Sequence, residues 1–354
     1  MKTLSLKIFV FCFYLLSVFA VISCSTVTYD KIFPTLKDGK YDSEFPYTGS
    51  SMELEKISKT VNRINATGFY KTYLFDPADS ITLDKFKYIQ FEDLAIETGY
   101  TDKSSSGTAT TIYSSGGKVA LLTCAHVINY PDTVITYAAG ESGILTNSIE
   151  VILVKDRQVI YAAGFPEGSD LEILALDPVK DLALIGRDYK SASKYSFDVF
   201  NFPPGNAKDL EWGTFVYIFG YPMNYQMVTK ALVSSPNRDR YGSFLVDAVV
   251  NPGYSGGVVL AIKDGIPNFE LVGIVQWVPE EKRDLLTPQR RKNNNPYSNL
   301  IPYKGDVYVH RYSEIKYGIA KVISIERVKS FLSKNKEQLE EKGYFFSSGT
   351  NRLM

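Results

Sequence analysis

The chain has 354 residues, its 39 Lys and Arg residues balance 39 Asp and Glu residues, and 45% of its residues are hydrophobic. This composition predicts a packed globular protein and excludes disordered, collagen-like and low-complexity chains. The balanced charge gives no electrostatic reason to expect a nucleic-acid partner. Because there are 2 His residues, a mechanism that needs histidine has two candidates.

The first 23 residues have the pattern of an export signal. Lys2 and Lys7 precede an apolar run from Ile8 to Ile22, which is shorter than the roughly 20 residues that span a bilayer. The run ends in VISC at residues 21–24, which resembles a bacterial lipobox and predicts cleavage before a lipidated Cys24. The alternative is an ordinary secretory signal cleaved at the same bond. We expect an exported chain, lipid-anchored to the cell-envelope membrane with its domain outside the cytoplasm.

Loss of residues 1–23 would change the charge and the cysteine count. The basic residues would fall from 39 to 37 against 39 acidic ones, a net charge of −2. Cys12 would leave with the signal and Cys24 would carry lipid, so Cys124 would have no partner for an intramolecular disulfide.

Polar residues 24–48, which contain Gly and Pro, predict a tether. A capping-box spacing at residues 50–53 then predicts a short amphipathic helix. Its apolar face is expected to hold Leu54, Ile57, Val61 and Ile64.

From about residue 68, short β-prone runs separated by turn residues predict an all-β sandwich or barrel. The clearest runs are Phe69–Phe75, Val119–Thr123, Glu150–Val154, Phe215–Phe219, Ser243–Val246, Val258–Ile262 and Leu271–Trp277. Near the end, Ser324 is predicted to cap a helix that carries Val328, Phe331, Leu332 and Leu339 and closes at Gly343. Residues 279–312, with the charged run at 290–296, are expected to form a solvated loop, or alternatively a lid or docking loop.

A serine on a glycine-rich turn is the first candidate for chemistry. Residues 251–257 read NPGYSGG, and a serine between glycines suits a nucleophile that a substrate carbonyl must approach closely. The alternative is a glycine-rich hairpin turn without a chemical role. Since a serine hydroxyl needs a base and a group that orients this base, the choice of histidine decides the fold.

His310 as the base would give the order Ser…Asp…His, with Asp284 or Asp306 as the acid. Residues 253–257 would then be the nucleophile elbow of an α/β-hydrolase, which requires a helix directly after the serine. The following GGVVLAI and KDG predict a strand that enters a hairpin instead. This pattern argues against His310 and leaves it a structural or exposed residue.

His126 as the base gives the order His…Asp…Ser. It ends an apolar strand, and Asp181 directly precedes the strand-like residues 182–185, with Asp177 as a rival acid. In this order the sequence resembles the trypsin-like serine proteases, nearest to their HtrA-type branch.

The resemblance runs from about residue 104 to residue 335. Its segments are SGTA at 106–109, LTCAHV at 122–127, DLAL at 181–184, GTFVYIFGYP at 213–222, DA at 247–248 with NPGYSGG at 251–257, VGIV at 272–275 and YGIA at 317–320. The resemblance implies an all-β, two-barrel chymotrypsin-like fold with a short N-terminal and a C-terminal helix. Residues 49–195 would form the barrel with His126 and Asp181, residues 196–345 the barrel with Ser255 and the closing helix, and residues 346–354 a tail.

The resemblance also implies the roles. Ser255 would attack the scissile carbonyl, His126 would take and return its proton, and Asp181 would orient the imidazole. The N–H groups of Gly253 and Ser255 would form the oxyanion hole.

The expected substrate pocket departs from that of trypsin. Its residues would be Val249, Asn251, Val275, Gln276 and Trp277. Val249 stands where relatives that select Lys or Arg carry an acid, so we expect small or medium apolar side chains at the cleaved position. Tyr254 replaces the aspartate that binds a newly cut N-terminus in trypsin-type zymogens, so this activation is not expected.

We therefore expect a serine endopeptidase for exposed or unfolded protein segments, without a cofactor or a metal site. About 12 residues follow the predicted last helix, too few for a PDZ domain within this chain. The alternative is a catalytically weak or inactive lipoprotein that keeps the fold and binds proteins.

Overall fold

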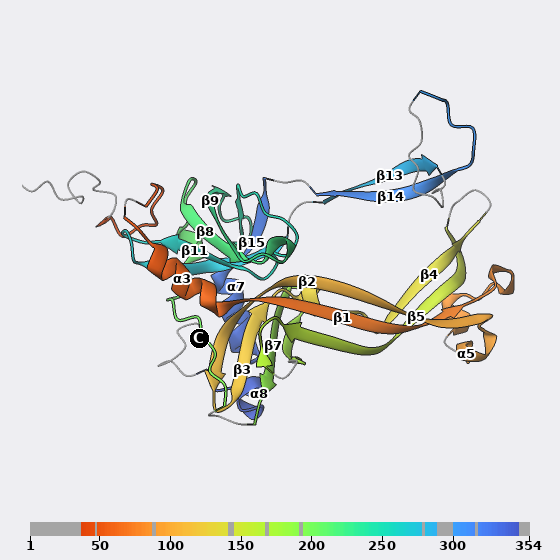
Figure 1. Ribbon diagram of the computed structural model, residues 1–354, viewed down its shortest axis with the longest axis horizontal. Coiled ribbons are helices and arrows are strands. Elements are labelled where there is room, and N and C mark those ends of the chain that lie inside the picture. Colours follow the sequence, from red (N-terminus) through yellow and green to blue (C-terminus); the bar gives the residue numbers. More distant parts are fainter. Residues whose placement is uncertain are drawn as a thin grey trace, which may run out of the picture.

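The computed structural model describes residues 37–46, 48–86, 90–140, 145–166, 170–190, 194–277, 280–288, 300–315 and 318–346. An open seven-stranded antiparallel sheet is followed by a closed six-stranded barrel (Figure 1). The predicted mostly-β, two-barrel architecture is confirmed, although the first sheet curls only part of the way to a barrel. No helix among these residues is both long and apolar enough to cross a membrane.

The first sheet carries the histidine side of the site. Its strands in spatial order are β4 (Thr133–Ala139), β5 (Leu145–Ala162), β1 (Val61–Leu74), β2 (Glu97–Ser115), β3 (Lys118–Thr123), β7 (Leu182–Asp188) and β6 (Glu172–Asp177). The Leu171 N–H donates to the Ile160 carbonyl at 2.7 Å, so the approach to β6 bonds back to β5 and the sheet curls on itself. The apolar residues of β3 and β7 fill the interior.

One end of this sheet is much longer than the sequence predicts. β1, β2 and β5 run on together as an extension away from the barrels (Figure 1). A separate small core of Tyr73, Phe75, Ile81, Ile149 and Ile152 stabilises it. The predicted runs at 69–75 and 150–154 lie here, but the polar, exposed first half of β2 gave no strand signal.

The second barrel carries the serine. Its strands in spatial order are β10 (Phe244–Val246), β15 (Ala320–Ser324), β12 (Phe269–Trp277), β11 (Val258–Ile262), β8 (Phe215–Gly220) and β9 (Met227–Ser235). β8 and β11 are buried at every residue, as expected for apolar central strands. Because β11 follows the serine turn directly, the α/β-hydrolase elbow is excluded.

The helices differ from prediction in their limits. α3 (Ser51–Thr60) ends before Val61 and Ile64, which lie in β1 and not on the helix. The Ser50 side chain does not cap α3, since its hydroxyl lies 3.4 Å from the Tyr217 hydroxyl.

The C-terminal helix breaks at Asn335 into α7 (Ile325–Lys334) and α8 (Lys336–Glu341). The predicted Ser324 cap is present, as its hydroxyl accepts the Arg327 N–H at 3.4 Å. Gly343 then closes the helix with a φ of 79°.

The described end of the predicted tether is docked. The Asp42 N–H donates to the Ile262 carbonyl at 2.9 Å, and the Phe215 N–H donates to the Asp42 carbonyl at 2.9 Å. The Tyr41 hydroxyl also donates to Glu270 Oε2 at 2.6 Å. Asp42 therefore ties this segment to one end of the second barrel, where β8 begins and β11 ends.

The segment after β12 forms a hairpin where the sequence predicted a loop. β13 (Glu280–Pro288) pairs with β14 (Val307–Ile315), and the two strands project from the barrel (Figure 1). Both strands of the hairpin contain β-prone residues among the polar ones. Leu286 lies opposite Val309, and both side chains are exposed. The charged run at 290–296 lies outside the described residues.

Candidate active site

His126 lies where an apolar strand ends. β3 leads into the short helix α6 (Ala125–Ile128), which contains His126. The residues on either side of His126, Ala125 and Val127, are buried. The imidazole keeps 45% of its surface exposed. The tight helical turn after a buried strand thus presents the ring to solvent at the edge of the sheet. The other histidine, His310, lies in β14 and is exposed.

Asp181 meets the histidine from the turn between β6 and β7. Its Oδ2 lies 2.8 Å from His126 Nδ1, and its Oδ1 accepts the His126 backbone N–H at 2.9 Å. Asp181 has a φ of +58°, a left-handed conformation that aspartate tolerates better than most residues. Its carboxylate is mostly buried, so one acid holds both the backbone and the ring of the histidine.

Asp177, the alternative acid, has a different role. Asp177 Oδ1 accepts the Lys180 backbone N–H at 3.0 Å, and its Oδ2 lies 3.7 Å from Lys180 Nζ. It therefore shapes the turn that presents Asp181.

The serine turn packs directly against the first sheet. The Thr108 N–H of β2 donates to the Ser255 carbonyl at 2.9 Å, and the Gly256 N–H donates to the Val275 carbonyl at 2.9 Å. A Cβ on Gly256 would lie 2.1 Å from the Thr108 carbonyl oxygen, so this close approach requires glycine. Two β-structures far apart in the sequence thereby meet at one serine.

The serine hydroxyl points to β12. Ser255 Oγ donates to the Gln276 carbonyl at 3.2 Å, and among the described residues no hydrogen bond joins it to His126. Nucleophile and base contacts are often loose before substrate binds.

Two backbone donors of the turn are free to bind an anion. Within the described chain, neither the Gly253 N–H nor the Ser255 N–H donates to a protein acceptor. Gly253 has a φ of +108°, and a Cβ there would lie 2.3 Å from the Tyr221 carbonyl oxygen. The turn therefore requires glycine at this position, and it carries one unbonded N–H group on either side of Tyr254.

The predicted pocket residues separate into two groups. Val275 is fully buried, and Gln276 and Asn251 are half-buried beside the serine turn. Val249 is 69% exposed and does not line a pocket, because its neighbours Ala248 and Val250 are the ones that point into the core. Trp277 ends β12, but its side chain lies outside the described part of the structure.

A buried thiol that the sequence did not indicate as part of the site lies beside the histidine. Cys124 Sγ donates to the Val275 carbonyl at 3.2 Å, and burial raises the pKa of this thiol well above its usual value. Its sulfur lies within 4.8 Å of ligand atoms of both His126 and Asp181. The sequence predicted no metal site and no cluster of Cys and His ligands, but the structure brings Cys124, His126 and Asp181 together where β3 meets α6. A buried protonated thiol and a carboxylate already bonded to histidine suit proton chemistry better than metal binding.

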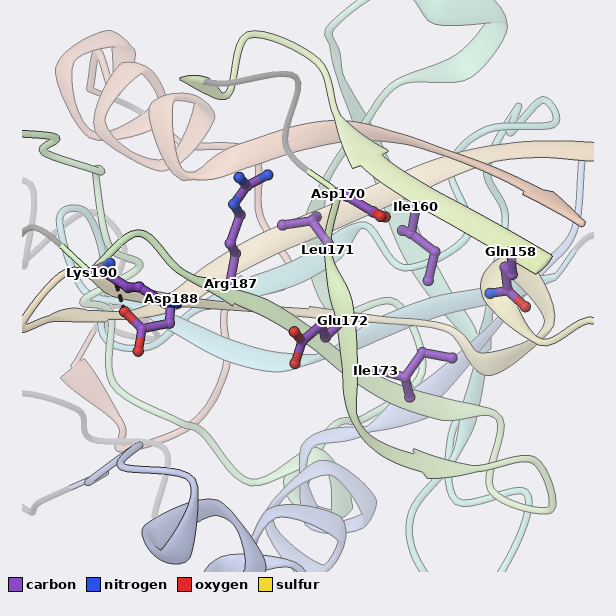
Figure 2. Close-up of a pocket in the computed structure, with 9 residues that line it drawn as sticks. All are labelled: Gln158, Ile160, Asp170, Leu171, Glu172, Ile173, Arg187, Asp188 and Lys190. Atoms are coloured by element: carbon purple, nitrogen blue, oxygen red, sulfur yellow. Dashed lines mark hydrogen bonds between the residues drawn. The ribbon is translucent and has the colours of Figure 1, made fainter.

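A separate hollow of about 680 Å³ lies on the first sheet between β5, β6 and β7 (Figure 2). Both charge signs line it, including Asp170, Glu172, Arg187 and Asp188, beside Ile160. None of the nine lining residues drawn in Figure 2 is His, Cys or Ser. The hollow shares no residue with the histidine–serine site.

The chain segment that builds this site matches a known family. Residues 107–274 match the trypsin-like peptidase domain. The matched segment of this domain contains His126, Asp181 and Ser255 and ends within β12. The match supports a serine-peptidase type of function with a protein or peptide substrate. A search among curated proteins found no similar one.

Proposed function

We propose that the chain is a serine endopeptidase in which Ser255 is the nucleophile, His126 the general base and Asp181 the residue that orients the base. The observation that carries the proposal is the 2.8 Å contact between His126 Nδ1 and the Asp181 carboxylate, at a site shared with the serine turn. A carboxylate on Nδ1 leaves Nε2 unprotonated and able to accept the serine proton.

The acyl-enzyme would form at the turn. Ser255 Oγ bonds to the scissile carbonyl carbon while its proton passes to His126, which then protonates the leaving amine. The Gly253 and Ser255 N–H groups would stabilise the negative oxygen, since both are unbonded in the described structure. Water then releases the acyl group by the same proton path.

The substrates would be extended or unfolded segments. Such segments bind in clefts by adding a strand, and the Gln276 carbonyl near the end of β12, which accepts the Ser255 hydroxyl in this structure, would offer one acceptor to a substrate N–H. The fully buried Val275 beside the serine turn supports a preference for small or medium apolar side chains at the cleaved position, whereas the outward-pointing Val249 gives no support to it.

A second candidate is a protein-binding module with little or no turnover. It is favoured by one observation, the bond of Ser255 Oγ to the Gln276 carbonyl instead of His126. A fluorophosphonate probe on the folded full-length protein separates the two candidates. We expect labelling at Ser255 and hydrolysis of an unfolded protein, both lost in Ser255→Ala; a folded wild type without labelling would favour the binding module.

We also propose export and lipidation at Cys24, with the domain outside the cytoplasmic membrane and nearest in type to the HtrA branch. The support is the VISC sequence after the apolar run. Acyl labelling in cells should occur in the wild type and disappear in Cys24→Ala. Processing that resists globomycin, without any acyl label, would point to an ordinary secretory signal.

A further inference from the structure

Thr108 connects the first sheet to the serine turn through its side chain. Its Oγ1 donates to the Gly253 carbonyl at 2.6 Å and accepts the Tyr221 N–H at 2.9 Å. Its backbone N–H donates to the Ser255 carbonyl, and its own carbonyl accepts the Thr123 hydroxyl at 2.7 Å. The residue is fully buried, so these bonds form away from competing water.

These bonds fix the two peptide planes on either side of Gly253. The Met223 N–H holds the Pro252 carbonyl at 3.2 Å, and the Thr108 hydroxyl holds the Gly253 carbonyl. In a trans peptide the N–H points opposite to the carbonyl, so the held Pro252 carbonyl directs the Gly253 N–H away from Met223. With both planes held, Gly253 keeps the positive φ that leaves its N–H unbonded.

The Tyr254 side chain provides no comparable bond, although the Tyr254 backbone N–H donates to the Asn251 carbonyl at 3.3 Å. Its hydroxyl is buried without a hydrogen-bond partner among the described groups, and its ring packs against Gly220. Packing of a ring fills space but does not set the direction of a neighbouring peptide, whereas a hydrogen bond to the carbonyl does.

We propose that Thr108 is a positioning residue that holds the Gly253 oxyanion donor in its working direction. The inference rests on the proposed peptidase function and deepens it. Thr108 touches no reacting atom; it acts through the Gly253 carbonyl. The Thr108 hydroxyl would hold this donor without the newly cut N-terminus on which trypsin-type zymogens depend.

The test removes the hydroxyl and keeps the shape. Thr108→Val is compared with Thr108→Ser, which retains the hydroxyl, on a chromogenic peptide substrate. We expect Thr108→Val to lower kcat about 10- to 100-fold with KM changed less than about threefold, because the donor acts mainly in the transition state. Thr108→Ser should recover most of the loss. A peptide boronic acid, which forms a tetrahedral adduct, should bind Thr108→Val more weakly by a similar factor than the wild type.

Thr110→Val is the matched control. Thr110 lies two residues along β2, is equally buried, and its hydroxyl has no hydrogen-bond partner among the described groups. Its replacement should leave kcat unchanged. An equal loss of kcat in both valine variants would mean a general structural effect and would overturn the inference.

The remaining outcomes separate the two proposals. Wild-type kcat in folded Thr108→Val, with Ser255→Ala inactive, would overturn the role of Thr108 and leave the peptidase function standing. A folded wild type that neither cleaves nor labels at Ser255 would overturn both. If Thr108→Val does not fold, Thr108→Cys takes its place, because the thiol has a similar size but is a weak donor; unchanged kcat there would also overturn the inference.

Discussion

Asp42 gives the molecule a pH-dependent stability at the point where the N-terminal segment docks. Asp42 is only 6% exposed. Its Oδ2 accepts the Gly265 N–H at 3.1 Å, and its Oδ1 has no hydrogen-bond partner among the described groups. Burial is the main cause that raises the pKa of Asp42 to about 6, and the nearby Glu44, Asp264 and Asp38 add to it. The Gly265 bond opposes this shift but does not cancel it.

The direction of the effect follows from the raised pKa. The folded state binds the proton more tightly than the unfolded state, whose aspartate has a pKa near 3.9. The stabilisation is therefore complete below about pH 4 and is lost as the pH rises through about 6. A difference of about two pH units corresponds to about 3 kcal/mol of unfolding free energy at pH 8.

Asp42→Asn removes the charge and keeps an oxygen for the Gly265 N–H. We expect it to be more stable than the wild type by about 2–3 kcal/mol at pH 8, and equal to it near pH 4. Urea unfolding of both proteins from pH 4 to pH 8 measures this. Asp38→Asn, at an exposed position in the same segment, should show no comparable pH-dependent gain. A gain for Asp42→Asn that is the same at pH 4 and pH 8, or a loss at pH 8, would refute the reasoning.

Three further substitutions test the site. Asp181→Asn should keep the fold, because asparagine also tolerates a positive φ, but should lower kcat about 10⁴-fold by changing the His126 tautomer; steady-state kinetics with a melting curve measure both. Tyr254→Phe should leave kcat unchanged and raise the unfolding free energy by up to about 1 kcal/mol, because the hydroxyl that it removes has no partner among the described groups. Urea unfolding measures this, and a lower unfolding free energy than that of the wild type would contradict the prediction. Gly253→Ala should lower kcat about 10²-fold or more with little change in KM, because a Cβ would press on the Tyr221 carbonyl and shift the loop; activity within a factor of three of wild type would contradict this.

The parts of the fold that sequence could predict are those where local pattern and burial agree. The apolar runs that became β3, β8 and β11 are buried at almost every residue, so the run itself carried the signal. The strand after Ser255 was predicted for the same reason, because its residues are apolar and β-prone, and it excludes the helix that the His310 alternative required. The Ser324 cap was likewise a local feature.

The parts that could not be predicted depend on partners distant in the chain. The polar first half of β2 is a strand only because β1 lies beside it, from Glu97 opposite Leu74 onward. Residues 37–46 looked like a tether, yet their backbone groups pair with strands about 170 to 220 residues later. Val249 points outward because the residues on either side of it, Ala248 and Val250, are packed into the core. The proposed role of Thr108 could not be predicted either, because the local sequence does not show which distant carbonyl a threonine hydroxyl will bond to.

The bond from Ser255 Oγ to the Gln276 carbonyl does not by itself decide between an enzyme and a binding module. Turning the serine side chain toward His126 exchanges one neutral hydrogen bond for another, and such a bond contributes about 1 kcal/mol. Even if the whole of that energy were lost, the rate would fall only about fivefold, which is small against the 10⁶-fold or greater acceleration typical of enzymes. A substrate N–H that takes over the Gln276 carbonyl would release the serine hydroxyl as the substrate binds. An inactive protein would need a larger defect, and the bonded His126–Asp181 pair and the free Gly253 and Ser255 N–H groups show none within the described site.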